Sequence, residues 1–152
     1  MGKINLGRVI LGGLVAGVVI NIVEGVTNGV LLAQRWNDSL SKLGQHAVTT
    51  KQIIAFNVWG FAVGILTVWL YAAIRSRMGA GARTGLCAGA FMWAAVCALA
   101  VAPPVFLHIY PLDLSLTALA IELPEMLIAA VAGAALYKEN GAEAARASSV
   151  AA

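Results

Sequence analysis

Four long apolar stretches dominate this chain of 152 residues and limit the folds that it can adopt. Uncharged runs cover 9–23, 53–74 and 84–112, and the stretch 114–137 is apolar apart from two glutamates. A helix needs about 20 residues to cross the hydrocarbon core of a bilayer. Only 11% of the residues are charged, whereas soluble domains carry about 25%. We therefore predict an all-α, multi-pass membrane protein whose surface faces lipid.

The apolar runs predict four transmembrane helices, at about 9–33, 53–74, 84–107 and 115–137. Short connections between them favour an antiparallel four-helix bundle. This bundle forms one transmembrane domain, residues 1–138. The remaining segment, 139–152, is small and polar, and we predict that it is a mobile tail.

Basic residues are divided unevenly between the two sides of the predicted bundle. The side of the termini and the second loop carries seven Lys or Arg residues, and the other side carries three. Because Lys and Arg accumulate in cytoplasmic loops, both termini are predicted to be cytoplasmic. The net charge of +3 then reflects topology. We expect the lipid bilayer to be a partner and expect no nucleic-acid partner.

Small residues recur at every fourth position of the first predicted helix: Gly13, Gly17, Asn21, Gly25 and Gly29. Shorter versions of the same pattern occur in later helices: Gly60 with Gly64, Gly85 with Gly89, and Ala129 with Gly133. Such ridges let two helix backbones approach closely. The pattern fits packing within the chain, and it also fits self-association or docking to another membrane subunit. Both uses stay open.

Three glutamates, Glu24, Glu122 and Glu125, lie inside predicted spans with no Lys or Arg at comparable depth. An acid at the bilayer centre costs about +2.5 to +3.5 kcal/mol, and such residues usually face a protein interior. At a rise of about 1.5 Å per residue, Glu24 lies about 18 Å below Trp36, and Glu125 lies about 18 Å below Asp113. The acids are therefore predicted to share one depth.

Asparagines accompany these acids. Asn21 and Asn28 lie close to Glu24 along the first helix, and Asn57 of the second helix is placed to approach from the outer side. If the first and fourth helices pack through their small faces, the three carboxylates and these amides converge. The sequence therefore predicts an intramembrane polar cluster as the candidate site.

Three uses of this cluster stay open. Neutral glutamates can form hydrogen bonds between helices. Intramembrane acids can also bind a cation or exchange protons, as they do in transporters. A positive group of a partner chain or lipid is the third possibility.

A metal enzyme is a weaker hypothesis. No Glu-x-x-His pair exists in the chain, and His108 is predicted to lie roughly 15 Å above Glu24. His108 is therefore only a weak metal candidate. Cys87 and Cys97 are about 15 Å apart along one helix, too far for a disulfide, and we expect buried, inert thiols. With no catalytic motif in the sequence, we expect no enzymatic activity and no cofactor.

Three segments, GRVILGGLVAGVVINIVEGVTNG, WGFAVGILTVWLYAAIRSRMG and the closing LYKE, resemble a family of small uncharacterised bacterial membrane proteins with four predicted helices. The resemblance covers most of the chain and is strongest in the first two helices. It implies a bacterial inner-membrane location. It brings no activity and assigns no site residues.

Together these features predict a non-enzymatic membrane protein that acts through helix–helix assembly. It would work as a homo-oligomer or as an accessory subunit of a larger membrane complex. The alternative is a proton- or cation-coupled transporter that uses Glu24, Glu122 and Glu125.

Overall fold

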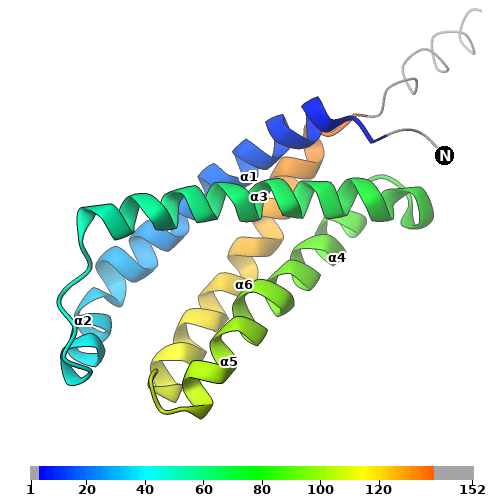
Figure 1. Ribbon diagram of the computed structural model, residues 1–152. Helices are drawn as coiled ribbons and strands as arrows, with labels where there is room; N and C mark the ends of the chain where they lie inside the picture. The colour runs from blue at the N-terminus through cyan, green and yellow to red at the C-terminus, as the bar shows by residue number, and fades with distance from the viewer. Residues whose placement is uncertain (1–3, 139–152) are drawn as a thin grey trace, which may run out of the picture.

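The computed structural model describes residues 4–138, and all regular secondary structure in this range is helical (Figure 1). Four continuous helical segments are long and apolar enough to cross a membrane: Leu6–Leu31, Thr50–Met78, Ala82–Phe106 and Leu112–Ala135. The prediction of an all-α chain with four such segments is confirmed. The predicted boundaries differ from the observed ones by one to four residues. The predicted tail, 139–152, lies outside the described residues.

Within these segments the helices are α1 (Leu6–Val26), η1 (Thr27–Leu31), α2 (Ala33–Lys42), α3 (Thr50–Met78), α4 (Ala82–Met92), η2 (Trp93–Ala98), α5 (Leu99–Phe106) and α6 (Leu112–Ala135). The elements η1 and η2 are π-helical. The first span is thus α1 continued by η1, and the third is α4, η2 and α5 in succession.

Local sequence signals set both ends of α3. At its start the Thr49 side chain accepts a hydrogen bond from the Gln52 backbone N–H, and Gln52 Oε1 accepts one from the Thr49 N–H at 2.8 Å. This reciprocal capping box satisfies backbone donors that a helix start leaves free. Gly79 follows the helix with a φ of 86°, and Gly81 precedes α4 with a φ of 131°. Glycine adopts these backbone angles without the steric cost of a side chain.

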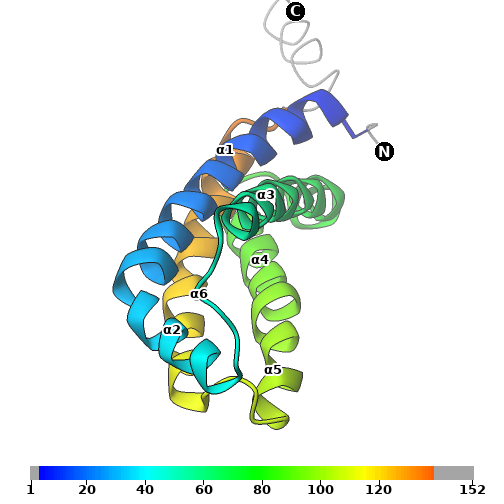
Figure 2. The same ribbon diagram turned by 60° about the vertical axis from the view of Figure 1, so that its left-hand side comes forward.

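In Figures 1 and 2, α6 lies between α1 and α4, and α3 crosses the side of the assembly. Contacts join α3 to α1, α4 and α6, and join α6 to α1 and α4. We call the end that holds Asn5, the α3–α4 turn and Tyr137 the terminal end. We call the opposite end, with α2 and the α5–α6 turn, the loop end.

Aromatic side chains close the terminal end. The rings of Tyr71 and Tyr137 meet edge to face, with centroids 5.9 Å apart. The Arg75 guanidinium lies 5.2 Å from the Tyr137 centroid and 5.9 Å from that of Tyr71. The Asn5 backbone N–H donates to the Tyr137 hydroxyl at 3.3 Å. These contacts tie the start of α1, the end of α3 and the end of α6 together.

The glycine ridge of α1 packs against α3. A Cβ atom added to Gly64 would lie 2.5 Å from the carbonyl oxygen of Gly13 and 2.5 Å from the backbone nitrogen of Gly17. Added to Gly13, it would lie 2.5 Å from Ile65 Cα. The two backbones therefore touch along this ridge, as small-residue packing allows.

A second ridge of α1, rotated from the first, packs against α6. A Cβ atom added to Gly12 would lie 2.5 Å from the Gly133 carbonyl oxygen. A Cβ added to Gly133 would lie 3.1 Å from that of Ala16, and Ala129 one turn away is fully buried. The first and fourth spans do pack through small residues. They use Gly12 and Ala16, whereas the predicted Gly13–Gly17 ridge faces the second span.

Toward the loop end α1 and α3 separate. A Cβ atom added to Gly25 or Gly29 would meet no atom within 4 Å. Residues 50–59 of α3 are all exposed. The molecule is thus tightly packed at the terminal end and open at the loop end.

Asn21 marks the last close contact between the two helices, because its side-chain amide donates to the Asn57 carbonyl oxygen at 3.1 Å. Replacing Asn21 with alanine is expected to lower the free energy of unfolding by about 0.6 kcal/mol, the average for a hydrogen bond between membrane helices. Thermal unfolding in mild detergent measures the change. Asn37→Ala, at an exposed position of α2, is the control. Equal stability of the two variants would contradict the prediction.

Candidate functional site

The structure brings the three intramembrane glutamates together. The Glu125 carboxyl interacts electrostatically with those of Glu24 and Glu122, and Glu24 interacts with Glu122 as well. Packing of α1 against α6 produces this arrangement, since Glu24 lies on α1 and the other two acids lie on α6. We call Glu24, Glu122 and Glu125 the carboxyl cluster.

The three members differ in their surroundings. Glu125 is only 3% exposed, and its Oε2 has no hydrogen-bond partner among the described residues. Glu24 and Glu122 are half-buried. Glu24 accepts a hydrogen bond from the Asn28 side-chain amide. The most buried carboxyl of the cluster therefore has an oxygen atom without a hydrogen-bond partner among the described residues.

A hydrogen-bonded chain runs from Glu24 toward the loop end. The Asn28 amide that donates to Glu24 also accepts, through its Oδ1, from Trp36 Nε1 at 2.8 Å. The Trp36 ring in turn meets the Tyr110 ring edge to face, at 5.5 Å between centroids. The helix breaks at Leu32, whose φ is −107°, and the chain continues as α2. This break lets a side chain eight positions further along reach back to Asn28.

The third span covers another side of the cluster. The Cys97 thiol and the Glu122 carboxyl interact electrostatically. One turn before Cys97, Trp93 Nε1 donates to the Leu119 carbonyl oxygen at 3.1 Å. Trp93 and Cys97, one turn apart on η2, thus contact Leu119 and Glu122, which lie about one turn apart on α6.

Trp36, Trp93 and Cys97 were not predicted to lie at the site. A signal for the two tryptophans existed, because a buried indole N–H usually finds an acceptor. The spacing of Trp93 and Cys97, at i and i+4, also places them on one helix face. No sequence signal identified Asn28 Oδ1 as the acceptor for Trp36, since that contact depends on the break at Leu32.

Irregular helix surrounds the carboxyl cluster. Glu24 lies three residues before the π-helical η1, and Cys97 lies within η2. Pro124 lies inside α6 between the two acids of that helix and lacks a backbone donor. Single π-helical turns occur frequently at functional sites. The irregular backbone and the carboxyl cluster therefore indicate the same region as the candidate site.

Asn21 and Asn57, two of the predicted cluster residues, serve a different contact. The Asn57 side chain is exposed and donates to the carbonyl oxygen of Ile53 at 2.8 Å. Its backbone carbonyl accepts from Asn21. The two asparagines join α1 to α3, and within residues 4–138 neither donates a hydrogen bond to a member of the carboxyl cluster.

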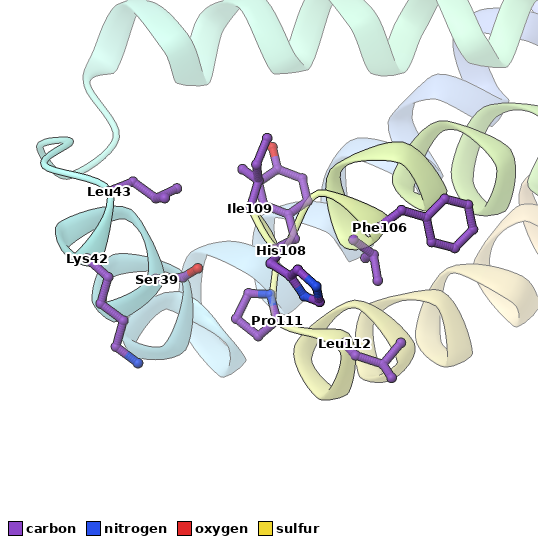
Figure 3. Close-up of a pocket in the computed structure, with 10 residues that line it drawn as sticks. Ser39, Lys42, Leu43, Phe106, His108, Ile109, Pro111 and Leu112 are labelled. Atoms are coloured by element: carbon purple, nitrogen blue, oxygen red, sulfur yellow. The ribbon is translucent and has the colours of Figure 1, made fainter.

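A hollow lies at the loop end of the molecule, lined by none of the three acids (Figure 3). It has a volume of about 540 Å³ and lies between the end of α2 and the α5–α6 turn. Its polar lining includes Lys42 and His108, while apolar side chains such as Phe106 and Ile109 form much of the rest. It is an open surface hollow that contains no member of the carboxyl cluster.

A metal centre finds no support in the side-chain arrangement. In the part of the chain that the structure describes, no three His, Cys, Asp or Glu residues are grouped so that they could hold a metal ion. His108 lines the hollow at the loop end. Cys97 is half-buried, but Cys87 is exposed. The expectation that both thiols are buried was therefore wrong for Cys87, which lies on the outer surface of α4.

The groups that meet at the cluster are carboxyls and one thiol, with amide and indole donors beside them. Carboxyls can bind a cation, and they can take up and release protons. Within residues 4–138, the electrostatic partners of the three acids include no Lys, Arg or His. Comparison with protein-family models, curated proteins and solved structures gave no match to this chain.

Proposed function

We propose that this chain is a non-enzymatic protein of the bacterial inner membrane that acts through helix–helix assembly as a homo-oligomer. The observation that carries the proposal is the unpartnered outer half of the α1 ridge. Gly13 and Gly17 contact α3, while Gly25 and Gly29 have no neighbour within 4 Å of an added Cβ. The glycine ridge thus continues along the first span beyond the part that contacts α3.

Exposed residues around these glycines form one apolar face: Ile22, Gly25, Val26, Gly29 and Val30. Glycines spaced by four, flanked by β-branched side chains, form a groove beside a ridge, and this shape suits close contact between helices. The face is self-complementary in a twofold dimer, in which the same patch of each copy meets the other. A second copy of the chain is therefore the partner that we propose.

The proposed topology places the four spans antiparallel in the bilayer with both termini in the cytoplasm. Support comes from the basic residues at the terminal end, which include Arg8, Arg75, Arg77 and Arg83. The loop end carries Arg35, Lys42 and Lys51. An excess of Lys and Arg marks the cytoplasmic side.

Substituting leucine for both Gly25 and Gly29 is expected to weaken self-association. Bulky side chains inserted into a close contact cost about 1–3 kcal/mol, which corresponds to a roughly 5- to 150-fold larger dissociation constant. Native mass spectrometry in mild detergent, over a range of protein concentrations, measures the monomer and oligomer populations. The thermal unfolding midpoint of the monomer should be unchanged, because nothing lies within 4 Å of either position.

A matched control is the pair Ala62→Leu and Ala90→Leu, at exposed positions of α3 and α4. This control should keep the oligomer of the wild-type chain. A wild-type chain that is only monomeric would refute homo-oligomerisation. Oligomers that survive the Gly25 and Gly29 substitutions would show that another surface holds the copies together.

A further inference from the structure

Glu125 is difficult to explain as a structural residue. A buried carboxyl that joins helices should be hydrogen-bonded, because an unsatisfied buried polar group costs about 1–3 kcal/mol. Only 3% of Glu125 is exposed, yet its Oε2 has no hydrogen-bond partner within residues 4–138. The side chain therefore stabilises no helix contact through this oxygen. Its oxygen is free to bind a ligand.

The titratable groups around Glu125 are acids and a thiol. Glu24 faces it from α1, and Glu122 lies one turn away on α6. Cys97 of η2 interacts electrostatically with all three acids. On α3, the only Lys, Arg, His, Asp or Glu before Arg75 is Lys51, at the opposite end of that helix. The ligand that fits such surroundings is a cation.

We propose that Glu125, together with Glu24 and Glu122, forms a binding site for an exchangeable proton that is reached from the loop end. The proposal goes beyond the proposed assembly and rests on different residues. In the exchange step the O–H bond of the protonated carboxyl breaks, and the proton passes to a water molecule, which leaves a carboxylate and a hydronium ion. The reverse step restores the acid.

The geometry favours a proton over a metal ion. A bound metal requires several ligands at fixed short distances, and no three suitable side chains are grouped in that way among the described residues. Buried carboxyls that interact electrostatically without a counter-charge cannot all ionise readily, so their protons come off in coupled steps. A proton needs only one oxygen atom, which Glu125 Oε2 supplies.

The direction of access follows from the contrast between the two ends. At the terminal end, Arg75 and the edge-to-face rings of Tyr71 and Tyr137 close the helix ends. On the other side, the hydrogen-bonded side chains of Asn28 and Trp36 lead from Glu24 toward the loop end. The polar route and the looser helix packing are therefore on the same side of the cluster.

Infrared spectroscopy of the full chain in liposomes tests the proposal, because the C=O stretch of a protonated carboxyl is separate from that of a carboxylate. We expect a protonated-carboxyl band that shifts when H₂O is replaced by D₂O. Its intensity should fall as the pH is raised from about 5 to about 9, a range that covers ordinary and buried glutamates. Glu125→Gln should remove a large part of the pH-dependent band.

Asp113→Asn is the matched control, since Asp113 is exposed and paired with Arg35 at 2.6 Å. This variant should keep the band. Glu24→Gln should move the remaining pH profile toward lower pH, because it removes a like charge that faces Glu125. A purely structural carboxyl would not produce that coupling.

A protonated-carboxyl band that responds to neither D₂O nor pH would overturn the proposal and identify an inert buried acid. The absence of such a band, with a carboxylate signal that changes on addition of Na⁺ or K⁺, would also overturn it and identify a metal-cation site. If Glu125→Gln fails to fold, the wild-type isotope and pH responses and the Glu24→Gln profile still decide the outcome.

Discussion

Gly64→Ala is expected to lower the free energy of unfolding by about 1–3 kcal/mol, the range for overpacking a close contact. The added Cβ would lie 2.5 Å from the Gly13 carbonyl oxygen and from the Gly17 backbone nitrogen. Both atoms belong to the backbone of α1, so no side-chain rotation can relieve the contact, and the two helices must move apart. Thermal or denaturant unfolding in mild detergent measures the loss.

Gly25→Ala is the matched control when both variants are measured as monomers, because it makes the same chemical change in α1 where nothing of the chain itself lies within 4 Å. Alanine favours a helix over glycine by up to about 1 kcal/mol, so this variant should be as stable as the wild-type chain or slightly more stable. If the two variants unfold alike, the close approach of α1 and α3 at Gly64 is wrong.

Glu125→Met is expected to raise the free energy of unfolding by about 1–3 kcal/mol, which is the cost of an unsatisfied buried polar group. Methionine is close to glutamate in length, and it fills irregular apolar space well. The same substitution should remove a large part of the pH-dependent infrared band. A gain in stability accompanied by a loss of proton binding is the result expected of a residue retained for its chemistry.

Glu24→Met provides the comparison within the same cluster. Glu24 accepts a hydrogen bond from Asn28, so its loss leaves that amide without its acceptor and should destabilise the protein. A more stable Glu125→Met variant and a less stable Glu24→Met variant would show that Glu24 stabilises the fold and that Glu125 does not. If Glu125→Met is less stable than the wild-type chain, Glu125 stabilises the helix contact, and the structural explanation of the cluster is the better one.

Much of the fold follows from hydropathy, because spans of about 20 apolar residues can avoid water only in a bilayer or a protein core. The four spans and the small-residue ridges could therefore be predicted from the sequence. The helix that packs against each ridge could not be predicted. Spacing identifies residues that share a helix face, but it does not say which helix lies opposite. The Gly13–Gly17 ridge consequently contacts α3, while Gly12 and Ala16 contact α6.

The acids of the candidate site were also readable, since charge is rare in an apolar span. Their partners depend on backbone irregularities that the sequence does not display. The break at Leu32 brings Trp36 to Asn28, and the η2 segment carries Cys97 beside Glu122. Asn57 was expected to turn toward the acids, but its amide bonds within its own helix.

The π-helical turn of η1 has a consequence for how the first span can change shape. Each residue of an α-helix advances the direction of its side chains by about 100°. If η1 shifted by one residue into α-helical register, the segment beyond it would rotate by that angle relative to Glu24. Trp36 would then leave Asn28, and the link between the loop end and the acids would open. A register shift in this segment would therefore rotate the far end of the first span relative to its packed part.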